Sequence, residues 1–250
     1  MPKTRAIEYK PYTLKAYWFN RTQNAQECAG SLSNFLRSLK DLETPFINWN
    51  YFNTKEKIEP TPLDVDEIRK QLLLPGNGAK RGVKPEETMP IMGFDVLLFS
   101  AGKNSERVTL NMTYGVSDGE GWNRCCIDLP TKGGIATQAL QTANLIKLME
   151  VVVRAWHPDW AVIDYFDYSD PDRSVNYIPV YWLVYLSEQR GKIPHLPSAS
   201  TVGSIEGYGN YVITTPDPFT RDCPDHLEIA SQVRDSLAQA RLLDARPSSG

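Results

Sequence analysis

Residues 115–119 read Gly-Val-Ser-Asp-Gly and match G-x-S-x-G, the pattern around the nucleophilic serine of α/β-hydrolases. That chemistry needs Ser117 on a sharp turn from a strand into a helix, a histidine as base, and backbone N–H groups for the oxyanion. An apolar stretch predicts a strand before the motif, but Gly119-Glu120-Gly121 does not favour a helix after it. His195 and His226 follow in the sequence and could serve as the base. A serine hydrolase is therefore one reading, and a glycine-rich hairpin loop explains the same residues.

Three other catalytic patterns are incomplete. Cys223 and His226 are close in sequence, but zinc needs two more ligands and no second Cys or His cluster supplies them. Residues 76–82 are rich in glycine, but a phosphate-binding Walker loop needs Ser or Thr after Lys80 and a helix behind it. Nucleases of the restriction-endonuclease type carry an acid before an Asp/Glu-x-Lys motif, and Glu8-Tyr9-Lys10 has no acid before it. We expect no metal, no cofactor and no nuclease activity.

An acidic aromatic segment is the strongest candidate for a binding surface. It alternates carboxylates with aromatic rings: Asp164, Tyr165, Phe166, Asp167, Tyr168, Asp170 and Asp172. Aromatic side chains are enriched at the energetic centres of protein interfaces, and carboxylates speed association with a basic partner. A solvated acidic turn accounts for the same charges without a partner.

Trp122 marks a second candidate surface. It follows Asp118 and Glu120 on a glycine-rich loop, where a tryptophan is harder to bury than in a regular element. The remaining tryptophans lie in or beside predicted helices and strands, which favours a place in the core.

Periodic apolar stretches predict the elements that flank these loops. Residues 12–19 alternate apolar and polar side chains, which predicts a strand. Residues 25–42 place apolar side chains three and four apart, which predicts a helix capped by the polar residues before it. Residues 94–100, 107–114 and 124–129 predict a meander, with the loop of Trp122 before its last strand.

The acidic aromatic segment has flanking elements of its own. Residues 135–156 predict the longest helix, which Pro158 ends in a Trp-His-Pro-Asp-Trp corner. Strands are predicted before and after the segment, over residues 160–164 and 180–186. The chain after them predicts three further pieces: a long connection over 188–209, a short strand over 211–215, and a last helix opened by Asp222 and Pro224 that runs to about Leu243.

These elements predict an α+β fold in a single domain, with an antiparallel or mixed sheet flanked by about three longer helices. No internal repeat and no linker-like composition divides the chain. We place the domain at residues 12–243, between an N-terminal extension at 1–11 and a C-terminal tail at 244–250.

Composition narrows the function further. The 250-residue chain has a net charge of −3, so no global basic field recruits nucleic acid or anionic membrane. No apolar window approaches the roughly 18 residues of a membrane span, and no secretory signal follows the first residues, so we expect a cytoplasmic protein. Its four cysteines contain no C-x-x-C pair, which favours free thiols.

Several short motifs together resemble the immunity protein 52 family of bacterial polymorphic toxin systems. The likeness covers about residues 12–243. It rests on these stretches in order: Ala16-Tyr17-Trp18, Gln26-Glu27-Cys28-Ala29, Pro45-Phe46 with Trp49, Met92-Gly93-Phe94, Cys126-Ile127-Asp128-Leu129-Pro130, Ala155-Trp156-His157-Pro158-Asp159-Trp160-Ala161, Thr214-Thr215-Pro216-Asp217-Pro218-Phe219 and Pro224-Asp225-His226. Family members often have Gly-Pro-Arg after the first tryptophan, where this chain has Phe19-Asn20-Arg21.

The resemblance implies a non-enzymatic antitoxin of an effector–immunity pair in bacterial competition. Such proteins bind a cognate nuclease toxin of restriction-endonuclease fold, often delivered by type VI secretion, and protect the producing cell and its siblings. The family offers no binding residues by motif. The toxin-binding residues we predict come from the acidic aromatic and Trp122 segments: Asp164, Tyr165, Phe166, Asp167, Tyr168, Asp170, Asp172, Asp118, Glu120 and Trp122. The alternatives are the Ser117 hydrolase and a general scaffold.

Overall fold

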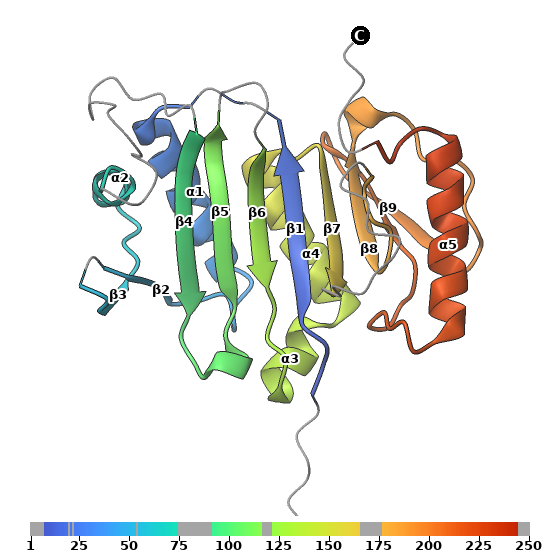
Figure 1. The fold of residues 1–250 in the computed structure, drawn as a ribbon, viewed down its shortest axis with the longest axis horizontal. Coiled ribbons are helices and arrows are strands. Elements are labelled where there is room, and N and C mark those ends of the chain that lie inside the picture. Colours follow the sequence, from blue (N-terminus) through green and yellow to red (C-terminus); the bar gives the residue numbers. More distant parts are fainter. Residues whose placement is uncertain are drawn as a thin grey trace, which may run out of the picture.

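A single antiparallel sheet forms the centre of the protein (Figure 1). The computed structural model describes residues 8–19, 21, 23–53, 55–74, 92–116, 122–165 and 177–244. Ten strands follow the order β3-β2-β4-β5-β6-β1-β7-β8-β10-β9, and each neighbouring pair runs antiparallel. The strands are β1 (Tyr12–Trp18), β2 (Trp49–Phe52), β3 (Ile58–Pro60), β4 (Met92–Ser100), β5 (Thr109–Val116), β6 (Asn123–Asp128), β7 (Trp160–Tyr165), β8 (Leu183–Ser187), β9 (Thr201–Ile205) and β10 (Gly209–Ile213).

Five α-helices accompany the sheet within the described residues: α1 (Ala25–Lys40), α2 (Val65–Leu72), α3 (Gly133–Ala139), α4 (Thr142–Trp156) and α5 (Pro224–Gln239). Short 3₁₀ turns are η1 (Asn104–Glu106) and η2 (Glu188–Arg190). α1 begins as predicted. The Asn24 side chain accepts the backbone N–H of Glu27, and the Glu27 carboxylate accepts the N–H of Asn24, which forms a capping box. The Asp64 side chain caps α2 by accepting the backbone N–H groups of Asp66 and Glu67.

The main core lies between the sheet and helices α1 and α4, which are behind the strands in Figure 1. β1 is the central strand, between β6 and β7. Its alternate residues Leu14, Ala16 and Trp18 are buried on the helix side, because neighbouring side chains of a strand point to opposite faces. Lys15 and Tyr17 therefore point to the other face.

The other face is covered over one part of its width. Val233 and Leu237 of α5 pack in a second apolar cluster with Val162, Val184 and Val212 of strands β7, β8 and β10. In Figure 1, α5 lies in front of the sheet at its right-hand end. Over β4, β5 and β6, none of the described helices covers this face.

Three sequence-based predictions need correction. The helix predicted over residues 135–156 is two helices, because Gln141 adopts an extended backbone (φ −68°, ψ 130°) between α3 and α4. Apolar periodicity continues through this break, so it does not reveal it. The sheet is also larger than predicted. β9 lies within the predicted connection 188–209, and β3 includes Pro60, which edge strands tolerate. Finally, the N-cap of α5 is Cys223 rather than Asp222, with Pro224 in the first turn.

Among the described residues, no helix combines the length and the apolar character that crossing a bilayer requires.

Candidate functional site

Asp164, the first residue of the acidic aromatic segment, lies inside the sheet. It is 7 % exposed, and its Oδ1 accepts a hydrogen bond from Lys15 Nζ at 2.7 Å. Both side chains point to the face that α5 partly covers, at the border between its covered and open parts. The carboxylate compensates a largely buried ammonium, so Asp164 has a structural role whatever partner the chain binds.

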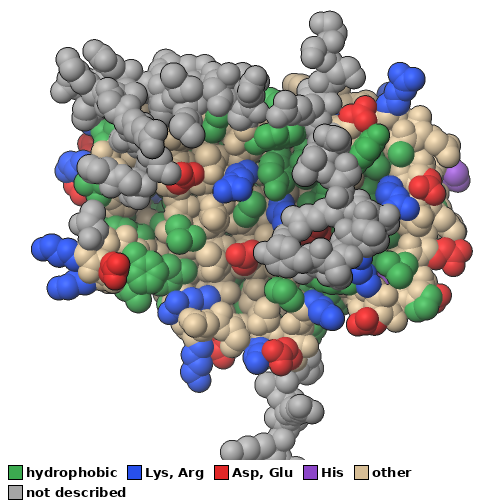
Figure 2. Space-filling view, in the orientation of Figure 1, with side chains coloured by type: hydrophobic (Ala, Val, Ile, Leu, Met, Phe, Trp, Pro, Cys, Tyr) green, Lys and Arg blue, Asp and Glu red, His purple; other side chains and the backbone are tan. Residues whose placement is uncertain are grey.

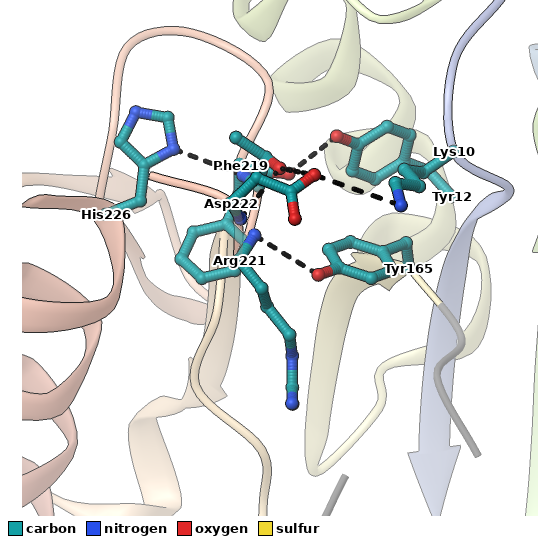
Figure 3. Close-up of polar contacts among 8 residues, drawn as sticks. Lys10, Tyr12, Tyr165, Phe219, Arg221, Asp222 and His226 are labelled. Carbon is teal, nitrogen blue, oxygen red and sulfur yellow. Dashed lines mark hydrogen bonds and ion pairs between the residues drawn. The ribbon is translucent and has the colours of Figure 1, made fainter. Parts of the chain in front are cut away.

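Tyr165 belongs to a network that ties three distant parts of the chain together (Figure 3). Its hydroxyl accepts the backbone N–H of Arg221 at 3.1 Å. Tyr12 donates to the carbonyl of Phe219 at 2.6 Å, and Lys10 and Asp222 form an exposed ion pair at 3.9 Å. Burial, and then the neighbouring Tyr165, raise the pKa of Tyr12, which keeps its hydroxyl a donor. The network fixes the turn before α5 against β1 and the end of β7.

The Trp-His-Pro-Asp-Trp corner is a packed hinge between α4 and β7. His157 has a left-handed backbone (φ 45°) and ends α4. Arg21 donates to the carbonyls of Trp156 and His157 at 2.7 and 2.6 Å, while Asp159 accepts the N–H of Phe19 at 2.9 Å. These contacts hold the corner in place through the carbonyls of Trp156 and His157 and the Asp159 carboxylate.

Trp122 is packed into the fold, contrary to the expectation of an exposed tryptophan. Its ring contacts those of Tyr17, Phe19 and Trp160, with centroids 5.8, 4.5 and 6.2 Å away. It is half-buried at the edge of the α5 cluster. The adjacent strand residues Tyr17 and Trp160 provide a flat aromatic surface, which explains why a loop residue can bury its ring.

Tyr165 and Trp122, one from each predicted segment, lie toward opposite ends of the β1–β7 strand pair. Tyr12 pairs with Tyr165 and Tyr17 pairs with Trp160 in the β1–β7 register, so Tyr165 and Trp160, against which Trp122 packs, are separated by roughly 17 Å at about 3.3 Å per residue. The other predicted binding residues lie outside the described residues: Phe166, Asp167, Tyr168, Asp170, Asp172, Asp118 and Glu120. Their contact with a toxin stays a prediction.

The G-x-S-x-G motif lies between two antiparallel neighbours rather than between a strand and a helix. β5 ends at Val116 and β6 begins at Asn123, whose side chain accepts the N–H of Val116 at 2.9 Å. Gly115 has φ +79°, and a Cβ there would lie 3.1 Å from the Cys28 sulfur. Close packing against Cys28 therefore explains Gly115, the first glycine of the motif. Ser117 itself lies outside the described residues, and the next described element after β5 is strand β6 rather than the helix that a nucleophile elbow requires.

Among the described residues, no three His, Cys, Asp or Glu side chains gather closely enough to hold a metal ion. Burial raises the pKa of Cys28 to about 12 and also raises those of Cys125 and Cys126. All four cysteines are free thiols, and these three are disfavoured as thiolates at neutral pH.

Sequence reasoning missed an exposed apolar group on the open part of the sheet. Phe52, Ile58 and Leu97 are 52, 55 and 53 % exposed. Residues 96–99 of β4 read Val-Leu-Leu-Phe. A strand that is apolar at four consecutive positions has apolar side chains on both faces. Because no described helix covers one of those faces, this run was the signal that could have located the surface.

Comparison with known proteins identifies the family. The model of the immunity protein 52 family matches residues 10–246, from the start of β1 through α5. No curated protein matches the chain. Among solved structures, the T6SS protein PA0821 of Pseudomonas aeruginosa superimposes with a TM-score of 0.60 at 12 % identity, covering 96 % of this chain and 77 % of that chain. This likeness supports the fold, and the family match spans nearly the whole chain. The chain therefore belongs to the immunity protein 52 family.

Proposed function

We propose that this chain binds a cognate nuclease toxin of restriction-endonuclease fold and neutralises it in the cytoplasm, which protects the producing cell and its siblings. The family match over residues 10–246 carries the proposal. The fold likeness to a T6SS protein supports type VI secretion as the delivery route.

The inhibition we propose is stoichiometric. A complex of this kind buries on the order of 1,600 Å² in total and can cover the basic surface with which a nuclease holds DNA. The chain has a net charge of −3, which favours association with a basic partner. The proposed acidic and aromatic contacts are those predicted from sequence, at residues 165–172 and 118–122.

The deciding experiment is co-purification with the product of the adjacent gene, followed by nuclease assays with and without this chain. We expect a stable complex and loss of DNA cleavage at a one-to-one ratio. Failure to form a complex, or cleavage unchanged by excess chain, would overturn the proposal. The Ser117→Ala variant should protect as well as the unmodified chain, whereas a serine hydrolase would lose its activity.

The location of the contact needs its own test. Asp167, Asp170 and Asp172 should be replaced by Asn together, with Asp164 retained because Lys15 depends on it. The control replaces three exposed acids elsewhere: Glu206, Glu228 and Asp235. Weaker toxin binding at low salt in the first variant alone supports the acidic segment. Equal toxin affinity of both variants would show that the acidic segment does not contact the toxin.

A further inference from the structure

The open part of the sheet carries one continuous apolar patch, which we call the Phe52 patch: Phe52, Ile58, Leu97 and Phe99. Phe52 pairs with Ile58 across β2 and β3, and its ring lies 4.9 Å from that of Phe99. Leu97 and Phe99 are alternate residues of β4 and share its face; Leu97 is exposed there, whereas Phe99 is only 6 % exposed and forms the buried base of the patch. Figure 2 shows apolar side chains gathered over the left part of this face, with charged side chains among them.

A polar rim surrounds the Phe52 patch on the neighbouring strands. Asp95 is exposed and accepts a hydrogen bond from Thr113 at 2.8 Å. Arg107 lies over the Phe99 ring at 4.8 Å, and Asn111 and Arg124 are exposed on the strands beyond. An apolar centre with a mixed polar rim is the usual anatomy of a protein–protein interface.

The sheet opens beside the Phe52 patch. β2 pairs with β4 only at Trp49–Ser100 and Asn50–Phe99, so β4 from Leu98 back to Met92 has no outer strand partner among the described residues. A cavity of about 220 Å³ lies in this gap. Its lining includes Phe52 and Leu97 from the open face, and Ile68 and Leu72 of α2 from the helix side. The cavity therefore leads from the patch toward the core.

The size of the cavity limits its occupant. Small-molecule and cofactor sites usually occupy about 300–1,000 Å³, and this cavity, at about 220 Å³, is smaller. It has room for one large apolar side chain. The Thr61 hydroxyl, which lines the cavity, is buried and has no hydrogen-bond partner among the described residues.

We propose that the Phe52 patch is the apolar centre of the toxin interface, and that a side chain of the toxin inserts between β2 and β4. The inference rests on the proposed function, because family membership supplies a protein partner. The toxin would cover the open part of the sheet as α5 covers the other part, and a backbone segment of the toxin could pair with the edge of β4 that has no strand partner among the described residues. A carboxylate and basic groups at the rim would set its orientation.

The sheet itself supplies a matched control for the test. Leu97 and Val202 lie on one face, at opposite ends of one cross-strand row, and are 53 and 47 % exposed. Leu97→Arg, Leu97→Glu, Val202→Arg and Val202→Glu should all keep the far-UV circular dichroism and Tm of the unmodified chain. We expect both Leu97 variants to weaken toxin binding by about 30-fold or more. The Val202 variants should bind normally.

A third position tests the cavity. Val96 lines it and is half-buried, so Val96→Phe should fill the space and weaken toxin binding about 10-fold while the protein stays folded. If Val96→Phe binds the toxin with unchanged affinity, no side chain of the toxin enters the cavity, and that part of the proposal is wrong.

The outcomes separate this inference from the proposed function. If the toxin binds the unmodified chain and all Leu97 and Val202 variants equally, the patch is overturned and the antitoxin function stands. If the unmodified chain does not bind the toxin, the proposed function itself fails. If Leu97→Arg changes only the mass of the free chain in sedimentation analysis, the patch joins two copies of this chain, which also overturns the inference.

Discussion

One face of the sheet has two parts with different chemistry. A single cross-strand row runs through both of them, in the order Leu97, Asn111, Cys126, Lys15, Val162, Val184, Val212 and Val202. The residues from β7 to β10 are all valine, and Val162, Val184 and Val212 are at most 1 % exposed beneath α5. The residues from β4 to β1 are mixed, and Asn111 and Leu97 are exposed.

The comparison teaches how a wide sheet divides its surface. The valines of β7, β8 and β10 are buried in the cluster with α5, whereas Val202 at the end of the row stays 47 % exposed. The Lys15–Asp164 ion pair lies at the border, where a charged pair can still reach the solvent at one side. On the open part, the apolar side chains are confined to β2, β3 and β4, and a partner protein would have to cover them.

The largest expected effect concerns the covered part. Leu237 of α5 is fully buried in the valine cluster. Leu237→Ala should lower the free energy of unfolding by about 3 kcal/mol, since it removes buried methyl groups and leaves a cavity. Urea denaturation measures the change. A loss below about 1 kcal/mol would mean that α5 contributes little to the covered part and would break the comparison.

The second-largest effect is expected at the Lys15–Asp164 ion pair, on the border between the covered and open parts. Asp164→Asn should cost about 2 kcal/mol of stability, because it leaves the Lys15 ammonium largely buried without its carboxylate. The Lys15→Met/Asp164→Leu double variant should recover most of this loss, as apolar side chains then occupy both positions. Thermal and urea unfolding of the three proteins provide the check. If the double variant is less stable than Asp164→Asn, the border needs its charges.

On the open part of the sheet, removing an apolar side chain should change stability little. Leu97→Ser removes an exposed side chain, so stability should change by no more than about 0.5 kcal/mol, measured by the same urea titration. A loss as large as that of Leu237→Ala would show that Leu97 is covered in the free protein and would contradict the open face.

The smallest effect compares the two faces of one strand. Cys125 is fully buried on the helix side, whereas the neighbouring Cys126 is partly exposed on the open side. Burial raises the pKa of Cys126, so its thiolate fraction at pH 8 is below that of an ordinary cysteine and rises as the pH increases. Mass spectrometry after brief iodoacetamide treatment should show modification of Cys126 that is slow at pH 8, faster above pH 9, and always ahead of Cys125. Equal rates would contradict the difference between the faces.

Much of the fold could be predicted because its signals are local. The alternation in residues 12–19, the Asn24 cap and the β4–β5–β6 meander each depend on side-chain period or on groups a few residues apart. The break at Gln141 could not be predicted, since the chain from Ile135 to Trp156 contains neither Gly nor Pro and its apolar spacing continues through the break. β9 was missed because Thr201–Ile205 contains Gly203 and depends on pairing with β10.

The candidate site was less predictable because exposure depends on distant contacts. The sequence marks Asp164 as an acid and Trp122 as a loop residue, but Lys15 and Tyr17 of the central strand decide how they are buried. The Phe52 patch combines residues from β2, β3 and β4. Its exposure depends on where α5 ends, which no local pattern records.

The central place of β1 has a consequence for synthesis. β1 is the first strand in the sequence, yet both its neighbours come much later: Lys15 pairs with Cys126 of β6 and with Val162 of β7. A sheet built on such distant pairings forms slowly. On the ribosome, the first strand must wait with its apolar side chains unpaired until β7 has emerged. Strand β1 therefore acquires both of its neighbours only after Tyr165, the last residue of β7, has left the ribosome.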